Sequence, residues 1–235
     1  MSVNKTTGFI ELPVHSGNGE AHGFYTPAEA SRIARVPQWT LSSWRREGVI
    51  VPSVEWVDEE GKAHLGHTFE TLVLMRLIRM LREKNITLIK AVEAVRSLRE
   101  RFGPPGKRWA DARIFAQNRD VFVYSADEWE TTVATRHGQK AADFLFGAEF
   151  ALLRDRADAL LIPRNYMQYV EIDPIIRNGL PIVLDTSVLT SVIHGLRQKG
   201  DTYDRIQSMY PFILRKTIIG TEKYERFLDA VGNAG

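Results

Sequence analysis

Apolar residues recur at helical spacing in two short runs near the N-terminus, and a proline separates the runs. The first run follows Thr26, which suits a helix N-cap, with Pro27 at the first helical position and Glu29 where a capping-box carboxylate reaches back. Pro37 disfavours helical geometry at the residue before it, so the second run starts a new helix, which ends near Gly48. The pattern therefore predicts a helix-turn-helix.

The second predicted helix has one apolar and one polar, basic face. Leu41 and Trp44 share the apolar face, which faces the first helix. Short polar side chains on the other face suit base edges, whereas arginine and lysine suit phosphates. We expect DNA contacts from eight residues of this region and the following hairpin: Arg35, Gln38, Thr40, Ser42, Ser43, Arg45, Arg46 and Lys62.

Extended stretches at 49–56 and 62–68 flank an acidic, turn-rich tip and predict a two-stranded wing. Thr68 then caps a helix with an apolar stripe, Asn85 interrupts the pattern, and Thr87 starts another such helix. The stripes on these two helices suit either a dimer interface or packing on the next segment, and both readings stay open here.

The remaining chain divides into a mixed segment and a helical tail. Short strands are expected at 113–116 and 121–124, a near-helical pattern runs over 139–156, and extended stretches are expected over 161–170. In the tail we expect three helices: one capped by Asp185 or Thr186 and ended by Gly200, one capped by Asp201 or Thr202, and one over 221–231.

Composition and charge narrow the class of protein. The 235 residues are 44% hydrophobic and contain no cysteine, which excludes disulfides and thiolate zinc sites and favours a reducing compartment. No apolar run approaches the length of a membrane span, so we expect a cytoplasmic protein. The formal charge is +2, and the basic excess lies in 25–101, where 13 basic residues face 10 acidic ones. Binding to nucleic acid would depend on a local basic face and dimerisation.

The sequence shows no clear pattern for a catalytic site or a metal-binding site. His64 and His67 have no further metal ligand at a suitable spacing. We interpret them as residues of a wing that lies near the DNA phosphates. The linker at 103–107 lacks the Ser or Thr that a phosphate-binding loop requires. We expect neither a cofactor nor an enzyme. Acidic residues of the middle segment are interpreted as solvated surface rather than a nuclease site: Asp111, Asp120, Asp127, Glu128, Glu130 and Asp143.

Two motifs in the first hundred residues resemble the DNA-binding head of the MerR family of winged-helix regulators. The run TLSSWRREGVI at 40–50 matches the family's second helix, and HTFETLVL follows at 67–74, at the expected distance. The acidic wing departs from the family pattern. The resemblance implies binding to double-stranded operator DNA by a homodimer.

The tail resembles the DUF433 family of small helix-turn-helix-like domains. The ordered matches are Asp173-Pro174, Gly179, Pro181, Ile182, Gly200 and Tyr210-Pro211. The family's Gly-Thr-Arg before the first helix is replaced here by residues 184–187, and 213–220 is longer than the usual turn.

A MerR-like head joined to a DUF433 tail is similar to antitoxins of the VapB type. That resemblance implies autoregulation of an operon and neutralisation of a PIN-domain ribonuclease toxin by direct contact, in a heteromeric complex. Because the active site of such a toxin is an acidic metal pocket, basic side chains are expected to inhibit it. The tail offers Arg177, Arg197, Arg215 and Lys216.

The alternative is a MerR-like regulator that responds to a small ligand and has no toxin partner. Its pocket would lie among aromatic residues of the middle segment: Trp109, Phe122, Tyr124, Trp129, Phe144, Phe146 and Tyr166.

The expected fold class is mainly α with a small β component. An N-terminal arm at 1–24 precedes a winged helix-turn-helix at 25–103, a short mixed α/β segment at 104–168 and a helical, helix-turn-helix-like domain at 169–235.

Overall fold

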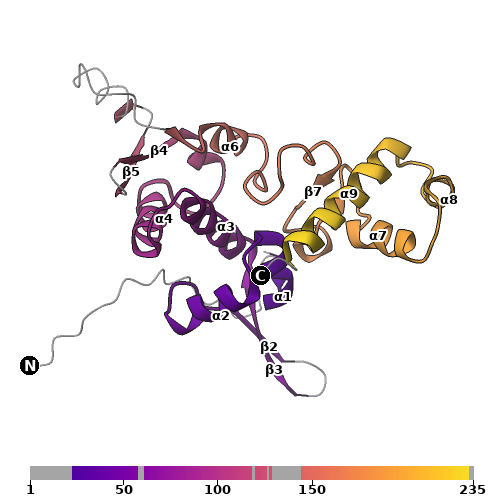
Figure 1. Ribbon diagram of the computed structural model, residues 1–235, viewed down its shortest axis with the longest axis horizontal. Coiled ribbons are helices and arrows are strands. Elements are labelled where there is room, and N and C mark those ends of the chain that lie inside the picture. Colours follow the sequence, from indigo (N-terminus) through magenta and orange to yellow (C-terminus); the bar gives the residue numbers. More distant parts are fainter. Residues whose placement is uncertain (1–22, 58–60, 118–119, 126, 129–143, 233–235) are drawn as a thin grey trace, which may run out of the picture.

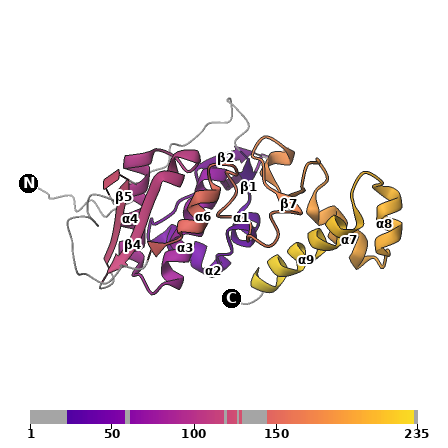
Figure 2. The same cartoon turned by 90° about the horizontal axis from the view of Figure 1, so that it is seen from above.

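The computed structural model describes residues 23–57, 61–117, 120–125, 127–128 and 144–232. Residues 1–22 of the expected N-terminal arm lie outside the described residues. The molecule is elongated, with the N-terminal helices near its middle, strands β4 and β5 at one end and helices α7 and α8 at the other (Figures 1 and 2). The expected class, mainly α with a small β component, is confirmed.

The head contains β1 (Phe24–Tyr25), α1 (Pro27–Ala34), α2 (Gln38–Arg46), β2 (Val54–Val57), β3 (Ala63–Thr68), α3 (Phe69–Glu83) and α4 (Leu88–Phe102). The predicted helix starts are confirmed, because Thr26, Thr68 and Thr87 each accept a backbone hydrogen bond as N-caps. Glu29 completes the capping box. The strands form one antiparallel sheet in the order β1-β3-β2, so the wing of β2 and β3 is anchored to the start of α1.

The middle segment contains η1 (Lys107–Asp111), β4 (Ala112–Gln117), β5 (Asp120–Ser125), β6 (Phe144–Leu145) and α6 (Gly147–Leu152). The predicted pair of strands is confirmed as the β4–β5 hairpin. The near-helical prediction over 139–156 is wrong at β6, whose backbone pairs with β4, and residues 139–143 lie outside the described part. Within the described residues 144–156, helix geometry is limited to α6.

Turns replace most of the extended structure expected over 161–170. Leu161 and Ile162 are buried, and only Val170 begins a strand. The Arg156 side chain donates to the carbonyl oxygens of Met167 (2.5 Å) and Val170 (2.8 Å) and pairs with the buried Asp158. A side chain thus satisfies carbonyl groups that would otherwise bond to a neighbouring strand. The periodicity of apolar residues does not reveal such a hydrogen bond.

The tail contains β7 (Val170–Glu171), η2 (Arg177–Gly179), β8 (Ile182–Val183), α7 (Thr190–Gln198), α8 (Tyr203–Met209) and α9 (Arg215–Gly232). The expected start of α7 at Asp185 or Thr186 is wrong. Thr186 instead bonds the Val183 carbonyl and the Val188 amide in a turn, and Ile182 pairs with Leu189. Gly200 ends α7 and Thr202 caps α8 as predicted, whereas α9 starts six residues early.

One hydrophobic core runs from the head through the middle segment into α9, where it includes Tyr224 and Leu228. A second, smaller cluster holds α7, α8 and the start of α9 together around Ile193, Ile206 and Ile218. The apolar stripes of α3 and α4 belong to the first core. That core includes residues of the middle segment, so the stripes pack on the next segment, which is one of the two readings left open for them.

The tail is locked to the head at two places. The Tyr25 hydroxyl donates to the Gly179 carbonyl over 2.7 Å. Arg32 on α1 pairs with Glu225 (2.6 Å) and Asp229 (2.7 Å) on α9, and the Thr190 hydroxyl of α7 also donates to Glu225. Helix α9 therefore lies against α1 at its C-terminal end and carries α7 and α8 at its other end (Figure 1).

We predict that Gly179→Ala destabilises the protein by about 3 kcal/mol, because strain and overpacking add there. Gly179 has φ 79°, and a Cβ atom would lie 2.1 Å from the Tyr25 hydroxyl oxygen. Gly200→Ala is the matched control, since its φ is 92° but nothing lies within 4 Å of the added atom, so about 1–2 kcal/mol is expected from strain alone. Urea unfolding measures both, and equal losses would contradict the close approach.

Candidate nucleic-acid interface

Helix α2 turns its polar face outward because Leu41 and Trp44 bury the opposite face. Gln38, Ser42 and Arg45 form one exposed stripe at spacings of four and three. Trp39, Ser43 and Arg46 form a second stripe beside it, in which Ser43 is half-buried. Both arginines lie in the last two turns of the helix, where the helix dipole favours positive charge.

Trp39 is a candidate contact that the predicted set lacks. Its side chain is 65% exposed, although tryptophan is a large apolar residue. Its angular position on the helix, opposite Leu41 and Trp44, was the available signal. An exposed indole beside two arginines suits contact with sugar or with a thymine methyl group.

Two polar residues of α2 have local roles. The Ser43 hydroxyl donates to Glu47 over 2.6 Å, one turn later. The Thr40 oxygen is buried and has no hydrogen-bond partner in the described part of the chain, so its hydroxyl does not face outward as predicted. Gln38 and Ser42 are the uncharged polar side chains of α2 that remain exposed on its outward face.

Arg35 departs from the predicted phosphate contact. It follows α1 in the left-handed region (φ 58°), which turns its side chain inward. The guanidinium donates to the carbonyl oxygens of Leu160 (3.0 Å) and Leu161 (3.2 Å) and lies 5.9 Å from the centre of the Phe227 ring. Arg35 thus joins the head to the middle segment and the tail, a role that only tertiary contacts reveal.

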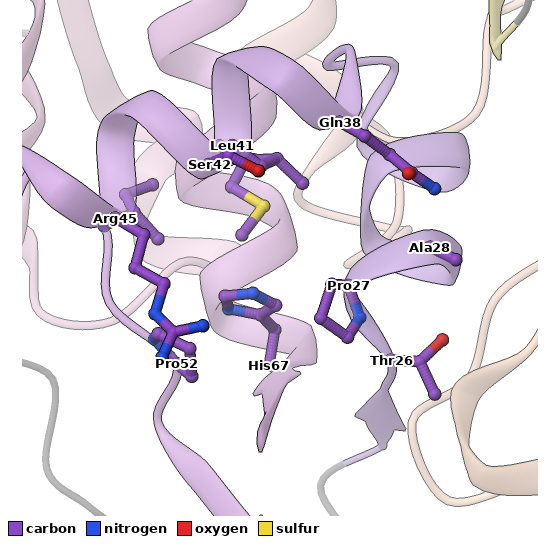
Figure 3. A pocket seen from close by; sticks show the side chains of 11 residues that line it. Thr26, Pro27, Ala28, Gln38, Leu41, Ser42, Arg45, Pro52 and His67 are labelled. Atoms are coloured by element: carbon purple, nitrogen blue, oxygen red, sulfur yellow. The ribbon is translucent and has the colours of Figure 1, made fainter. Parts of the chain in front are cut away.

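A pocket of about 350 Å³ lies between α2 and the start of α1 (Figure 3). Arg45 on α2 and His67 on β3 lie side by side there, facing Pro27. Burial and, to a smaller extent, the positive charge of Arg45 together lower the pKa of His67 to about 4. His67 is therefore neutral at pH 7 and buried below α2, not on the phosphate side of the wing as expected.

The wing places Lys62 beside its tip, just before β3, on an exposed part of the hairpin. Exposed Glu55 lies on the paired strand β2, so the wing carries both signs of charge. Among the described residues, no group of three or more His, Cys, Asp or Glu side chains is arranged to hold a metal ion.

The four basic residues predicted to contact a toxin lie in or near a lobe formed by α7, α8 and the start of α9. Arg197 and Arg215 flank the Tyr203 ring, with guanidinium carbons 4.2 Å and 5.8 Å from its centre. Arg215 also pairs with Asp204 (2.9 Å), and Arg177 donates to the Ser187 carbonyl (2.8 Å). Lys216 lines a separate pocket with Tyr169 and Lys223. They do not form a single cluster.

Other candidate residues of the middle segment have structural partners. Asp111 pairs with Arg154, Asp120 with Lys90 and Glu128 with Arg101, as expected for surface carboxylates. Glu130 and Asp143 lie outside the described residues.

The aromatic residues considered for a ligand pocket are divided among separate packing contacts. Trp109 stacks on Phe150, Phe122 and Tyr124 each stack on Phe115, and Tyr166 packs on Tyr224. Trp129 lies outside the described part.

Comparison with known proteins identifies the head. The family model for MerR HTH family regulatory proteins matches residues 25–98. Residues 25–98 are a MerR-family helix-turn-helix domain. The matched range covers α1, α2, the β2–β3 wing and α3, and it ends within α4. A helix-turn-helix domain of this family suggests a DNA-binding regulator.

The rest of the chain is compared at the level of fold. The crystal structure of Rv2018 from Mycobacterium tuberculosis is similar with a TM-score of 0.54 and 17% identity, over 91% of this chain and 98% of that one. The likeness therefore covers the whole arrangement of head, middle segment and tail. No curated protein matches the chain. In the part of the chain that the structure describes, no helix is both long and apolar enough to cross a membrane.

We predict that Arg46→Ala in the MerR-family domain weakens binding to all DNA sequences by about tenfold and lowers the salt slope by about 1, because one phosphate contact is lost. Arg154→Ala is the charge-matched control, since Arg154 lies outside the head and is 58% exposed. Electrophoretic titration over a range of salt concentrations measures both slopes. An unchanged slope for Arg46→Ala would exclude the phosphate contact.

We predict that His67 lowers stability in acid. Its pKa is about 4 in the folded protein against about 6.5 unfolded, so the unfolded chain binds the proton first and stability falls as pH drops from 6.5 towards 4. The contribution is about 3 kcal/mol between pH 7 and pH 4. His67→Leu removes it, and urea unfolding at several pH values should show a flatter profile. A variant profile parallel to that of the parent protein would refute this role.

Proposed function

We propose that this protein is the antitoxin of a type II toxin–antitoxin system, which binds operator DNA to autoregulate its operon and neutralises a PIN-domain ribonuclease by direct contact. The observation that carries the proposal is the separation of two surfaces on one chain. Helix α2, which carries the basic face, and helices α7 and α8 lie apart in both views (Figures 1 and 2), so DNA and a protein partner could be bound at the same time.

The DNA half of the proposal rests on the MerR-family domain. Exposed Gln38 and Ser42 are suited to base edges, and Arg45 and Arg46 to phosphates. Because the apolar stripes of α3 and α4 are covered within the chain, a homodimer on a palindromic operator would need another surface.

The partner half rests on the resemblance of the tail to the DUF433 family. The motif residues occupy positions with clear physical roles here. Gly179 and Gly200 have positive φ at turns, and the Pro181 carbonyl accepts a hydrogen bond from the backbone amide of the buried Thr190 at the start of α7. Tyr210-Pro211 follows the end of α8. The motif thus encodes the turns that frame α7 and α8.

A contact surface for a toxin is proposed at the tip of the lobe. Three large apolar side chains are exposed there, Met209, Phe212 and Leu214, and the basic Arg215 and Lys216 follow directly. Exposed apolar residues rimmed by charge are typical of protein-binding surfaces. Basic side chains next to them complement the acidic metal site of a ribonuclease of this class. The protein itself would carry no catalytic residues and would act in the cytoplasm.

We predict that co-expression with the product of the neighbouring gene yields a stable complex in which a Mg²⁺-dependent ribonuclease is silent. Reversal of Arg177, Arg197, Arg215 and Lys216 to glutamate should abolish inhibition while operator binding persists. Phe212→Asp with Leu214→Asp tests the apolar part alone, since both side chains are exposed. Arg46→Ala is the reciprocal control, which should lose DNA affinity and keep inhibition.

Size-exclusion chromatography with an untagged partner and an RNA-cleavage assay provide the measurements, with circular dichroism of each variant as the folding check. If no neighbouring product binds the chain, or if the charge-reversed and aspartate variants inhibit as well as the parent protein, the antitoxin proposal fails.

A further inference from the structure

A second pocket, of about 270 Å³, lies where the head meets the middle segment. Arg35 at the end of α1 and Arg76 on α3 line it from the head, and Arg164 lines it from the turns before β7. Glu149 of α6 is the acidic residue among the lining side chains. Three guanidinium groups against one carboxylate leave the pocket with an excess of positive charge.

Arg35 and Arg76 have unsatisfied donors at this site. The Nε groups of both are buried and have no hydrogen-bond partner among the described residues. The acidic partner of Arg76 is Glu83 at 3.5 Å, the outer limit of a hydrogen bond, and Glu83 also pairs with Arg79 at 3.1 Å. The Arg76 side chain is only 12% exposed, so water does not replace the missing partner freely.

The two arginines also disfavour each other's charge. Burial and, to a smaller extent, the positive charge of Arg76 together lower the pKa of Arg35 to about 9. Burial likewise lowers the pKa of Arg76, which Glu83 only partly offsets. Buried charges and buried donors without partners are costly, and an anion placed between them would remove both costs.

The rest of the wall is apolar. Met80, Leu152, Ile162 and Met167 line it together with alanine and proline residues. An inorganic anion would satisfy the guanidinium groups and leave this surface uncovered. The volume is near the lower end of the range for small-molecule sites, about 300–1,000 Å³. A compact molecule with one oxyanion group and a short apolar body fits both parts of the wall.

We propose that this pocket binds a small amphipathic anion, a carboxylate or a phosphate monoester, held by Arg35, Arg76 and Arg164. Guanidinium groups bind either oxyanion through paired hydrogen bonds. Because Arg35 already joins the head to the carbonyl groups of Leu160 and Leu161, the ligand would stabilise the junction between head and middle segment. The site differs from the aromatic cluster considered from sequence, and it does not depend on the antitoxin proposal.

Calorimetric titration and thermal unfolding of the full chain test the site with four probes: benzoate, phenyl phosphate, inorganic phosphate and uncharged benzyl alcohol. We expect saturable binding of benzoate or phenyl phosphate, with a rise in melting temperature of roughly 5–10 °C at a hundredfold excess over Kd. The stronger of these two identifies the oxyanion. Inorganic phosphate should bind more weakly, and benzyl alcohol should have no effect.

Arg76→Gln should weaken binding of the better probe by about tenfold or more, because a charge-assisted hydrogen bond is lost. Arg79→Gln is the matched control, since Arg79 lies on the same helix, pairs with the same Glu83 and does not line the pocket. Arg164→Gln, at an exposed residue, supplies a second test if Arg76→Gln does not fold. Failure of both anionic probes to bind, or equal losses for Arg79→Gln and the pocket variants, would overturn the proposal. Neither DNA nor a toxin enters the assay, so its failure leaves the proposed function intact.

Discussion

The ion pair between Arg32 and the buried Glu225 is the contact on which the arrangement of the molecule depends. Glu225 is 2% exposed, and a buried carboxylate is tolerated only where it is paired and hydrogen-bonded. Arg32 and the Thr190 hydroxyl meet that requirement from two different elements, α1 and α7. One carboxylate on α9 thereby fixes the position of the tail relative to the DNA-binding head.

The packing of the middle segment and the tail against the head divides the arginines of the head into two groups. Arg32, Arg35 and Arg76 turn inward, where they meet α9, the middle segment and the second pocket. Arg45 and Arg46 remain exposed on α2. A basic count over the head therefore overstates the charge available to DNA, and the positive charge that faces solvent on α2 is local. This favours a binding mode in which few phosphate contacts are made and a second copy adds affinity.

The middle segment packs against the head and also holds one of its inward-facing arginines. Its core packs on the apolar stripes of α3 and α4, and its turns supply the carbonyl groups that hold Arg35. A ligand between Arg35 and Arg76 would stabilise the contact between the head and the middle segment. Arg35 belongs to the turn that leads into α2. The pocket that would hold this ligand lies between the head and the middle segment and is not lined by residues of α7, α8 or α9.

The sequence by itself determined the head: the capping box at Thr26 and Glu29, the break at Pro37 and the inward pair Leu41 and Trp44 are interactions between residues close in the chain. Tertiary structure alone decided the turns before β7, the late start of α7 and the inward course of Arg35. Each depends on hydrogen bonds to groups distant in sequence or on a turn that competes with a helix, and periodicity carries no record of such partners.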